Sequence, residues 1–299
     1  MSIENNRSKK ISNIFINTFF VLMSFSFIIP FFVIISASLS NDMDIVRYGY
    51  SLIPRKIDLT AYNYILKDPS LILSSYKVTS ITSLISVAVY LAIASMCAYS
   101  LSRMNFRYRG TITFYLFFTM LFNGGLVPTY ILMTRYLHLK DTYLALIIPL
   151  LGNVWFIFLM RTFFQQLPEA IVESATIDGA GDFLIYMKLI LPLSKPVLAT
   201  VGLMQLLAGW NSWFPALLYI SDQNLYPLQY LLQVMLLNIQ EILNNMQNNM
   251  AISDPSLVKI PPESVRMAMC ILAVGPMVAV FPFFQKYFTK GLTVGSIKG

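Results

Sequence analysis

The sequence offers few side chains for covalent chemistry. Its single histidine, His138, stands in a short polar stretch, which excludes His–Glu metal sites and nucleophiles activated by histidine. No glycine-rich loop followed by Lys-Ser or Lys-Thr is present, so the chain lacks a P-loop for ATP hydrolysis. Cys97 and Cys270 lie far apart in apolar stretches and are expected to be free thiols. We therefore expect no enzymatic activity, no bound metal and no cofactor.

Carboxylates gather in one segment, residues 161–196. Pro168 suits the start of a helix, and Glu169 in its first turn interacts favourably with the helix dipole. Asp178-Gly179-Ala180-Gly181 predicts a turn, because glycine can adopt a positive φ. Asp182 is expected to cap a second short helix, and Pro192 to end it. On these grounds alone, the segment could equally be an amphipathic helical hairpin that lies at a membrane surface and has no specific binding role.

A second group of side chains could bind an uncharged polar ligand through amide hydrogen bonds and aromatic faces. Its members are Asn153, Trp155, Gln205, Trp210, Asn211 and Trp213. Amides are costly in lipid, so they are expected to face a bundle interior or a cavity. Each tryptophan could equally be an anchor at the membrane interface. A ligand role is favoured for Asn211, which is polar, deep in its stretch and flanked by aromatic residues.

The elements that must position these groups are apolar and long. Of the 299 residues, 57% are hydrophobic and 12% charged, about half the charge of a soluble domain. Six uncharged stretches are long enough, or nearly so, for a helix to cross about 30 Å of hydrocarbon. They are residues 11–41, 78–101, 111–134, 142–160, 196–221 and 267–285. Alternating strands are absent, so we predict an all-α membrane protein with six transmembrane helices.

The net charge of +7 predicts the orientation. On the side that holds both termini and segment 161–196, twelve basic residues stand against five acidic ones. The other side holds nine of each. Because positive loops face the cytoplasm, both termini are expected inside. The chain then has a short N-terminus (1–10) and one transmembrane domain (11–299), with two long outer segments, 42–77 and 222–266.

The carboxylate segment also carries a family motif. Glu173-Ser174-Ala175, Asp178-Gly179-Ala180 and Leu189-Ile190-Leu191-Pro192 resemble the EAA loop of binding-protein-dependent ABC importer permeases. Ser174 replaces the first alanine and Leu189 the usual isoleucine, and both changes are small.

Further stretches resemble the carbohydrate branch of these permeases. They are Phe122–Tyr130, Met160–Phe164, Trp210–Trp213 and the tail Phe284–Gly299. The resemblance covers nearly the whole chain. It is strongest to permeases for oligosaccharides and polysaccharide fragments, and more distant to the smaller membrane subunit of the maltose importer.

This resemblance implies the ABC type I importer permease fold in the cytoplasmic membrane of a bacterium. It implies a second permease subunit, two ATPase subunits that bind ATP and magnesium, and an extracytoplasmic solute-binding protein, within membrane lipid and without nucleic acid. The EAA helix would enter a cleft of the ATPase, with Glu173 near basic residues there. The residues implied in this coupling are Glu173, Ser174, Ala175, Asp178, Gly179, Ala180, Leu191 and Pro192. The tail that ends Lys298-Gly299 is a further candidate ATPase contact.

The amide and indole group described above would then line a sugar pathway. Two alternatives stay open: a permease of the same architecture for a non-sugar solute, and a stand-alone secondary transporter. The six stretches contain no Asp, Glu, Lys or Arg, which argues against a proton-driven carrier. A stand-alone carrier would also have no use for the EAA segment.

Overall fold

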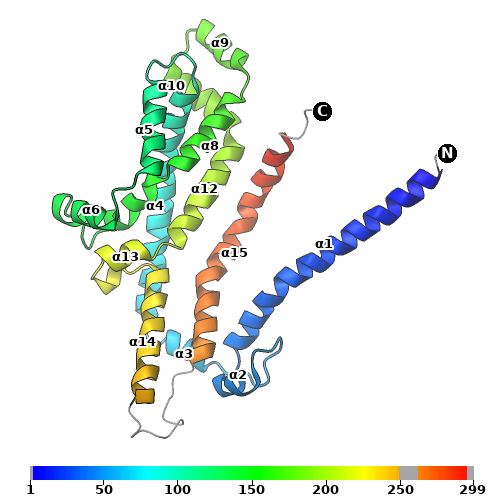
Figure 1. Cartoon of the computed structure of the whole chain (residues 1–299), viewed down its shortest axis with the longest axis vertical. Coiled ribbons are helices and arrows are strands. Elements are labelled where there is room, and N and C mark those ends of the chain that lie inside the picture. The colour runs from blue at the N-terminus through cyan, green and yellow to red at the C-terminus, as the bar shows by residue number, and fades with distance from the viewer. Residues whose placement is uncertain (1–2, 249–261, 295–299) are drawn as a thin grey trace. The chain divides into compact units, whose positions relative to one another are not determined.

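The computed structural model describes residues 3–248 and 262–294, which are mainly helical (Figure 1). Within these ranges the sole strand-type pairing is an isolated bridge between Ser40 and Ile57. The prediction of an all-α protein is confirmed for this part of the chain. Part of the predicted outer segment 222–266, including Asn249, lies outside the described residues. So do Lys298 and Gly299, which end the tail that was a candidate ATPase contact.

Among the described residues, three helices are long and apolar enough to cross a membrane on their own. They are Ser12–Ser38 within α1 (Ile3–Ser38), α4 (Pro69–Ser102), and Pro262–Phe283 within α15 (Pro262–Val294). Three bent helix pairs also qualify if each pair is counted as one span, so the described residues contain three to six candidate spans. α1 continues through Pro30, and α15 through Pro276 and Pro282. α4 begins at Pro69 rather than near Val78, so it is longer than the predicted second stretch.

The chain divides into two compact units, which we describe separately. The first holds residues 1–69 and 234–275, including α2 (Asp42–Tyr48) and α3 (Thr60–Ile65). In this unit the Asp42 carboxylate accepts hydrogen bonds from the backbone N–H groups of Glu263 and Ser264, at 2.9 and 3.1 Å. Burial raises the pKa of Asp42, although these two bonds oppose the shift. Asp42 thus satisfies donors at the start of α15 that have no partner within the helix.

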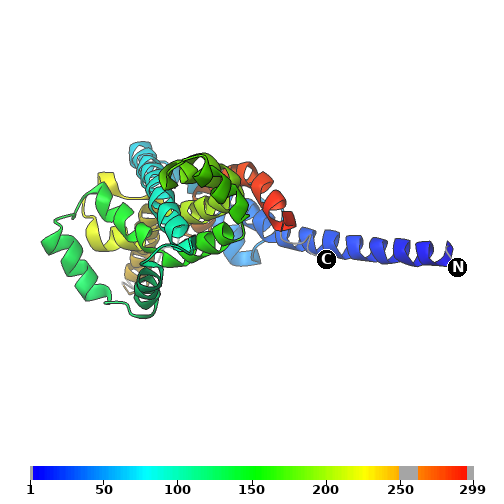
Figure 2. The ribbon, with the colours of Figure 1, turned by 90° about the horizontal axis from the view of Figure 1, so that it is seen from above.

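The second unit holds residues 70–233 and 276–299. Its core is built by α4, α8 (Val154–Gln165), α12 (Lys195–Trp210) and the continuous run of α10 (Asp182–Ile185) and the π-helical η3 (Tyr186–Ile190). The buried core side chains are Tyr90, Ala94, Ala98, Tyr99, Phe156, Met160, Phe164, Ile185, Tyr186, Ile190, Val197 and Val201. Figure 2 shows these helices from above, gathered into one bundle.

The predicted third stretch, 111–134, is not one straight helix. α5 (Arg109–Leu121) is separated by residues 122–125 from α6 (Leu126–Ile131) and η1 (Leu132–Tyr136), with a bend of 109°. Gly125 has a φ of +91°, and its N–H donates to the Asn123 side chain at 2.9 Å. Glycine and the Asn turn therefore break the helix. In both views α6 and η1 extend sideways from the bundle (Figures 1 and 2).

The fourth and fifth stretches also contain breaks. α7 (Tyr143–Ile147) and the 3-10 turn η2 (Ile148–Gly152) meet α8 at 51°. The fifth stretch was predicted as one helix over 196–221, which is wrong, because α12 ends at Trp210 and a short helix, α13 (Phe214–Tyr219), follows.

The two long segments predicted on the outer side are partly helical. Residues 42–77 contain α2, α3 and the start of α4, and residues 222–266 contain η4 (Gln223–Leu225), α14 (Leu228–Asn248) and the first turn of α15. In α14, Leu228, Leu231 and Leu232 are buried and follow the i, i+3, i+4 spacing of one helix face. That spacing was present in the sequence and predicts a helix.

Candidate functional site

The segment with the family motif forms a helix, a tight turn and a second helical run. α9 (Glu169–Ile177) begins directly after Pro168, and Glu169 lies in its first turn, as predicted. No residue of α9 is fully buried. In Figure 1 α9 projects beyond the end of the bundle formed by α4, α8 and α12.

Gly179 ends α9 in a left-handed conformation, with a φ of +81°. The Ala180 N–H donates to the Ala175 carbonyl at 2.9 Å, and the Gly179 N–H to the Thr176 carbonyl at 3.0 Å. This pair of bonds is a Schellman motif, which satisfies carbonyls at the helix end. The predicted turn is confirmed, and its shape depends on Gly179.

Two details of the predicted hairpin are wrong. Asp182 does not cap the second helix, because Gly181 occupies the N-cap position and Asp182 is the first helical residue. Pro192 does not end the helical run, which continues from η3 through α11 (Leu191–Leu193). Pro192 is tolerated because it stands in the first turn of α11, where the π-helical turn before it has already shifted the hydrogen-bond pattern.

The predicted coupling residues fall into two sets by environment. Glu173, Ser174, Asp178, Gly179 and Pro192 are exposed. Ala175, Ala180 and Leu191 are half-buried and pack against the core of the second unit. The turn is therefore attached to the bundle by small apolar residues and presents polar residues outward.

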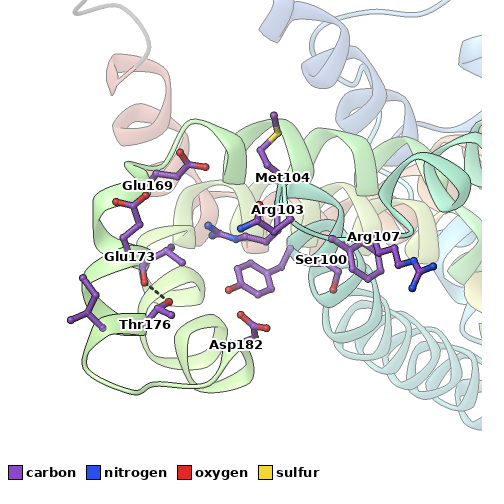
Figure 3. Close-up of a pocket in the computed structure, with 13 residues that line it drawn as sticks. Ser100, Arg103, Met104, Arg107, Glu169, Glu173, Thr176 and Asp182 are labelled. Atoms are coloured by element: carbon purple, nitrogen blue, oxygen red, sulfur yellow. Dashed lines mark hydrogen bonds between the residues drawn. The ribbon is translucent and has the colours of Figure 1, made fainter.

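A cleft of about 850 Å³ lies between α9 and the loop that joins α4 to α5. Figure 3 shows Glu169 and Glu173 on the α9 wall, with Arg103 extending toward them and Arg107 pointing away. Asp182 also lines the cleft. Within the described part of the chain, no salt bridge crosses it. The two walls thus carry opposite charges that are not in contact.

Arg103 is the residue of this cleft that sequence reasoning missed. Its guanidinium lies 4.7 Å from the centre of the Tyr99 ring, and its buried Nε atom has no hydrogen-bond partner. The sequence indicated Arg103 only as one of the basic residues that favour a cytoplasmic loop. No local signal places it opposite Glu173, because the two lie 70 positions apart in the chain.

The six predicted pathway residues lie in different environments. Gln205 is 1% exposed and donates from Nε2 to the Leu150 carbonyl at 2.6 Å. Trp210 is 5% exposed, with its ring 6.3 Å from that of Tyr76. Trp155 and Trp213 are exposed.

Both predicted asparagines lie where a helix starts or ends. Asn153 caps α8, and its side chain accepts a bond from the Trp155 N–H at 3.1 Å. Asn211 follows the last turn of α12 and donates to the Leu207 carbonyl at 2.9 Å. The Gln229 amide, on α14, lies 3.5 Å from the Asn211 oxygen. Gln229 was not predicted, although it is an amide close to an apolar helix.

Known proteins match this chain over nearly all of its length. Residues 2–294 match the family described as binding-protein-dependent transport system inner membrane component. A polygalacturonan/rhamnogalacturonan transport system permease protein of Bacillus subtilis is 36% identical over 282 residues, which cover 94% of this chain and 96% of that protein. An arabinooligosaccharides transport system permease protein of the same organism is 25% identical over 289 residues and covers 94% of each chain.

A solved structure agrees with the fold. The crystal structure of a bacterial ABC transporter involved in the import of the acidic polysaccharide alginate contains a chain that superposes with a TM-score of 0.77. That chain is 30% identical, and the match covers 94% of this chain and 98% of that one. The predictions of a permease fold, of an inner membrane location and of a transport subunit rather than an enzyme are confirmed. This chain belongs to the binding-protein-dependent ABC importer family, as its inner membrane permease component.

Proposed function

We propose that this chain carries an oligosaccharide or a polysaccharide fragment across the cytoplasmic membrane. The substrate class is supported by the names of its relatives, which transport polygalacturonan or rhamnogalacturonan in one case and arabinooligosaccharides in another. The solved transporter that it resembles imports alginate. The chain has no P-loop, so the energy has to come from separate ATPase subunits.

The proposed topology has six spans and both termini in the cytoplasm. Three long helices and three bent pairs supply six candidate spans. Non-helical breaks at membrane depth are tolerated where they are buried in protein or line a cavity, which suits the bends in these pairs. The excess of basic residues on the side of segment 161–196 supports the orientation.

One observation carries the coupling assignment. The polar residues of the α9 turn face outward, whereas its small apolar residues pack against the bundle. Glu173 and Asp178 are exposed at the end of the bundle, whereas Ala175 and Ala180 pack on its core. An ATPase that binds the exposed face would therefore contact a rigid projection of the transmembrane bundle. ATP-dependent changes in the ATPase could then bias inward- and outward-open states of the bundle.

The proposed complex contains a second permease subunit, two ATPases and an extracytoplasmic binding protein. A second permease is supported by α5, in which no residue is fully buried and Phe114, Tyr115 and Leu121 are strongly exposed. Such an apolar face in a membrane protein contacts lipid or another subunit. ATP and magnesium would be bound by the ATPases, and the chain itself would need no cofactor.

The proposed sugar pathway includes Asn211 and its neighbours. The Asn211 and Gln229 amides lie close together at the end of α12, and the exposed Trp213 follows Asn211 by two positions. Amides and aromatic faces are groups that bind sugar hydroxyls and C–H surfaces. Asn153 and Trp155 would form a second polar and aromatic pair, at the start of α8.

The test is uptake of labelled oligosaccharides by cells that express the complete importer with variants of this chain. Glu173→Lys should abolish uptake while leaving membrane insertion intact, because it reverses the charge on the exposed face of α9. Glu241→Lys, a charge reversal at an exposed position of α14, is the matched control and should preserve uptake. Normal uptake in the Glu173→Lys cells would remove the coupling assignment. Transport by the purified chain alone in liposomes would remove the requirement for an ATPase.

A further inference from the structure

The helix pair α5 and α8 holds an arginine with an incomplete set of hydrogen-bond partners. Arg161, on α8, donates from one terminal nitrogen to the Thr113 hydroxyl on α5, at 3.3 Å. Its Nε atom is buried and has no hydrogen-bond partner in the described part of the chain. A guanidinium offers five N–H donors in a planar fork, so most of the donor capacity of Arg161 is unused by the protein.

A second cation lies beside it. Arg109 is the first residue of α5 and stands four positions before Thr113, on the same face of the helix. Arg161 and Arg109 both belong to the Thr113 region of α5, Arg161 through its hydrogen bond to the Thr113 hydroxyl and Arg109 through its place one helical turn earlier. One terminal nitrogen of Arg109 also donates to the Met104 sulfur. Within residues 3–248 and 262–294, neither arginine forms a salt bridge. The pair is thus a concentration of positive charge without a counter-ion.

An apolar surface continues from this pair along both helices. α5 and α8 are in contact, and no residue of α5 is fully buried. Leu116 and Phe117 follow Thr113 by one helical turn and are partly or largely exposed. On α8, Phe158 precedes Arg161 by three positions and is also partly exposed. The charged group therefore sits at the edge of an exposed apolar strip.

We propose that Arg109, Thr113 and Arg161 bind the phosphodiester headgroup of an anionic membrane lipid, whose acyl chain lies along α5 and α8. A phosphate between the two guanidinium groups would balance both positive charges and accept hydrogen bonds from their terminal N–H groups, for which the planar fork is well suited. Basic pockets between transmembrane helices are known to suit such headgroups. The inference rests on the membrane location of the family and is independent of the transported solute.

A lipid accounts for more of these features than a free anion does. Inorganic phosphate would satisfy the guanidinium groups but would leave Leu116, Phe117 and Phe158 uncovered. A carboxylate of another subunit could approach the same cations, and it becomes an outcome of the test below. The strip and the cations together match a molecule that is anionic at one end and apolar at the other.

The test measures the thermal stability of the full-length chain in neutral detergent with added lipid. Short-chain phosphatidylglycerol should raise the melting temperature, whereas phosphatidylcholine and inorganic phosphate should not. Arg109→Gln and Arg161→Gln should each weaken the response to phosphatidylglycerol about fivefold, the effect of one basic residue at an anionic membrane surface. Arg107→Gln removes an exposed charge from the neighbouring loop and should leave the response unchanged.

Three results would overturn the proposal. The first is an equal response in the Arg109→Gln/Arg161→Gln chain and in the parent chain. The second is an equal response to inorganic phosphate, which would identify a free-anion site. The third is loss of the phosphatidylglycerol response when the other importer subunits are present, which would assign the arginines to a protein contact. If Arg161→Gln does not fold, Arg109→Gln tests the site with Arg161 intact.

Discussion

The side-chain amide of Gln205, in the middle of α12, donates a 2.6 Å hydrogen bond to the backbone carbonyl of Leu150, in η2. Leu150 lies in the 3-10 turn that precedes the bend into α8, where regular helical hydrogen bonds are interrupted. Gln205 is 1% exposed, so its amide is shielded from water. A buried amide from one helix thus supports a break in another.

Replacing Gln205 by leucine should therefore destabilise the protein by about 1–3 kcal/mol, the cost of leaving one buried polar group without a partner. Thermal unfolding in detergent measures this loss. Met204→Leu, at an exposed position next to Gln205, is the control and should have little effect. An unchanged melting temperature combined with altered sugar uptake would instead place Gln205 in the substrate pathway.

Substitutions at Gly179 test the conformation of the α9 turn, and Gly181 supplies the control position. Gly179 has a φ of +81°, whereas Gly181 has a φ of −74°, and a Cβ atom at either position would meet no neighbour within 4 Å. Gly179→Ala should cost about 1–2 kcal/mol of local stability from backbone strain alone, and Gly181→Ala should cost little.

Gly179→Pro should have a larger effect, because proline cannot adopt a positive φ and removes the N–H that bonds to Thr176. Uptake by the complete importer should fall in the order parent, Gly179→Ala, Gly179→Pro, with membrane insertion unchanged in each case. Equal uptake by Gly179→Pro and Gly181→Ala would show that the turn is not needed for transport.

Gly209 and Gly202 test how closely α12 approaches α4. A Cβ atom at Gly209 would lie 3.1 Å from the Cα of Ser83, so the backbones themselves would have to separate. At Gly202 the nearest atom is the Leu91 Cδ1, at 3.3 Å, at the end of a flexible side chain. Gly209→Ala should destabilise the bundle by about 1–3 kcal/mol, as overpacking does in other cores. Gly202→Ala should be nearly neutral, and similar melting temperatures for the two variants would refute this account of the contact.

Asp141 should make the stability of the protein depend on pH. Its carboxylate accepts hydrogen bonds from the backbone N–H groups of Ser221 and Asp222, which lower its pKa below the usual value. Because the pKa of Asp141 is lower in the folded state than in the unfolded state, the stabilisation by these two hydrogen bonds is complete above the unfolded pKa of about 3.9. It is lost as the pH falls through the folded pKa.

The comparison of Asp141→Asn with the parent chain isolates this effect, since asparagine keeps an acceptor but does not titrate. The melting temperature of the parent should fall more steeply than that of the variant between about pH 5 and pH 2. Glu241→Gln, at an exposed position of α14, should follow the parent. Parallel curves for the parent and Asp141→Asn would contradict the assignment.

Features that depend on neighbouring residues were predictable from the sequence. The turn at Gly179 follows from glycine and its immediate context, and the start of α9 follows from Pro168 and Glu169. The end of the second helical run was not predictable in the same way. Pro192 is a helix breaker by its local properties, yet the preceding π-helical turn accommodates it.

Features that depend on tertiary contacts could not be predicted. The cleft between Arg103 and Glu173 requires the loop after α4 to lie beside α9, and no spacing in the sequence encodes that proximity. Gln205 and Asn211 looked alike as amides within one apolar stretch. Their environments differ because one lies beneath the η2 turn and the other follows the end of a helix.

The Schellman turn at Gly179 has a mechanical consequence. Its two hydrogen bonds join Ala175 and Thr176 to the residues just after the helix, and both Ala175 and Ala180 pack against the buried core of the second unit. The C-terminal end of α9 is thus attached to the bundle core, whereas the rest of the helix projects from it. If an ATPase binds the exposed face of α9, as proposed above, a displacement of that face would reach the core helices through Ala175 and Ala180.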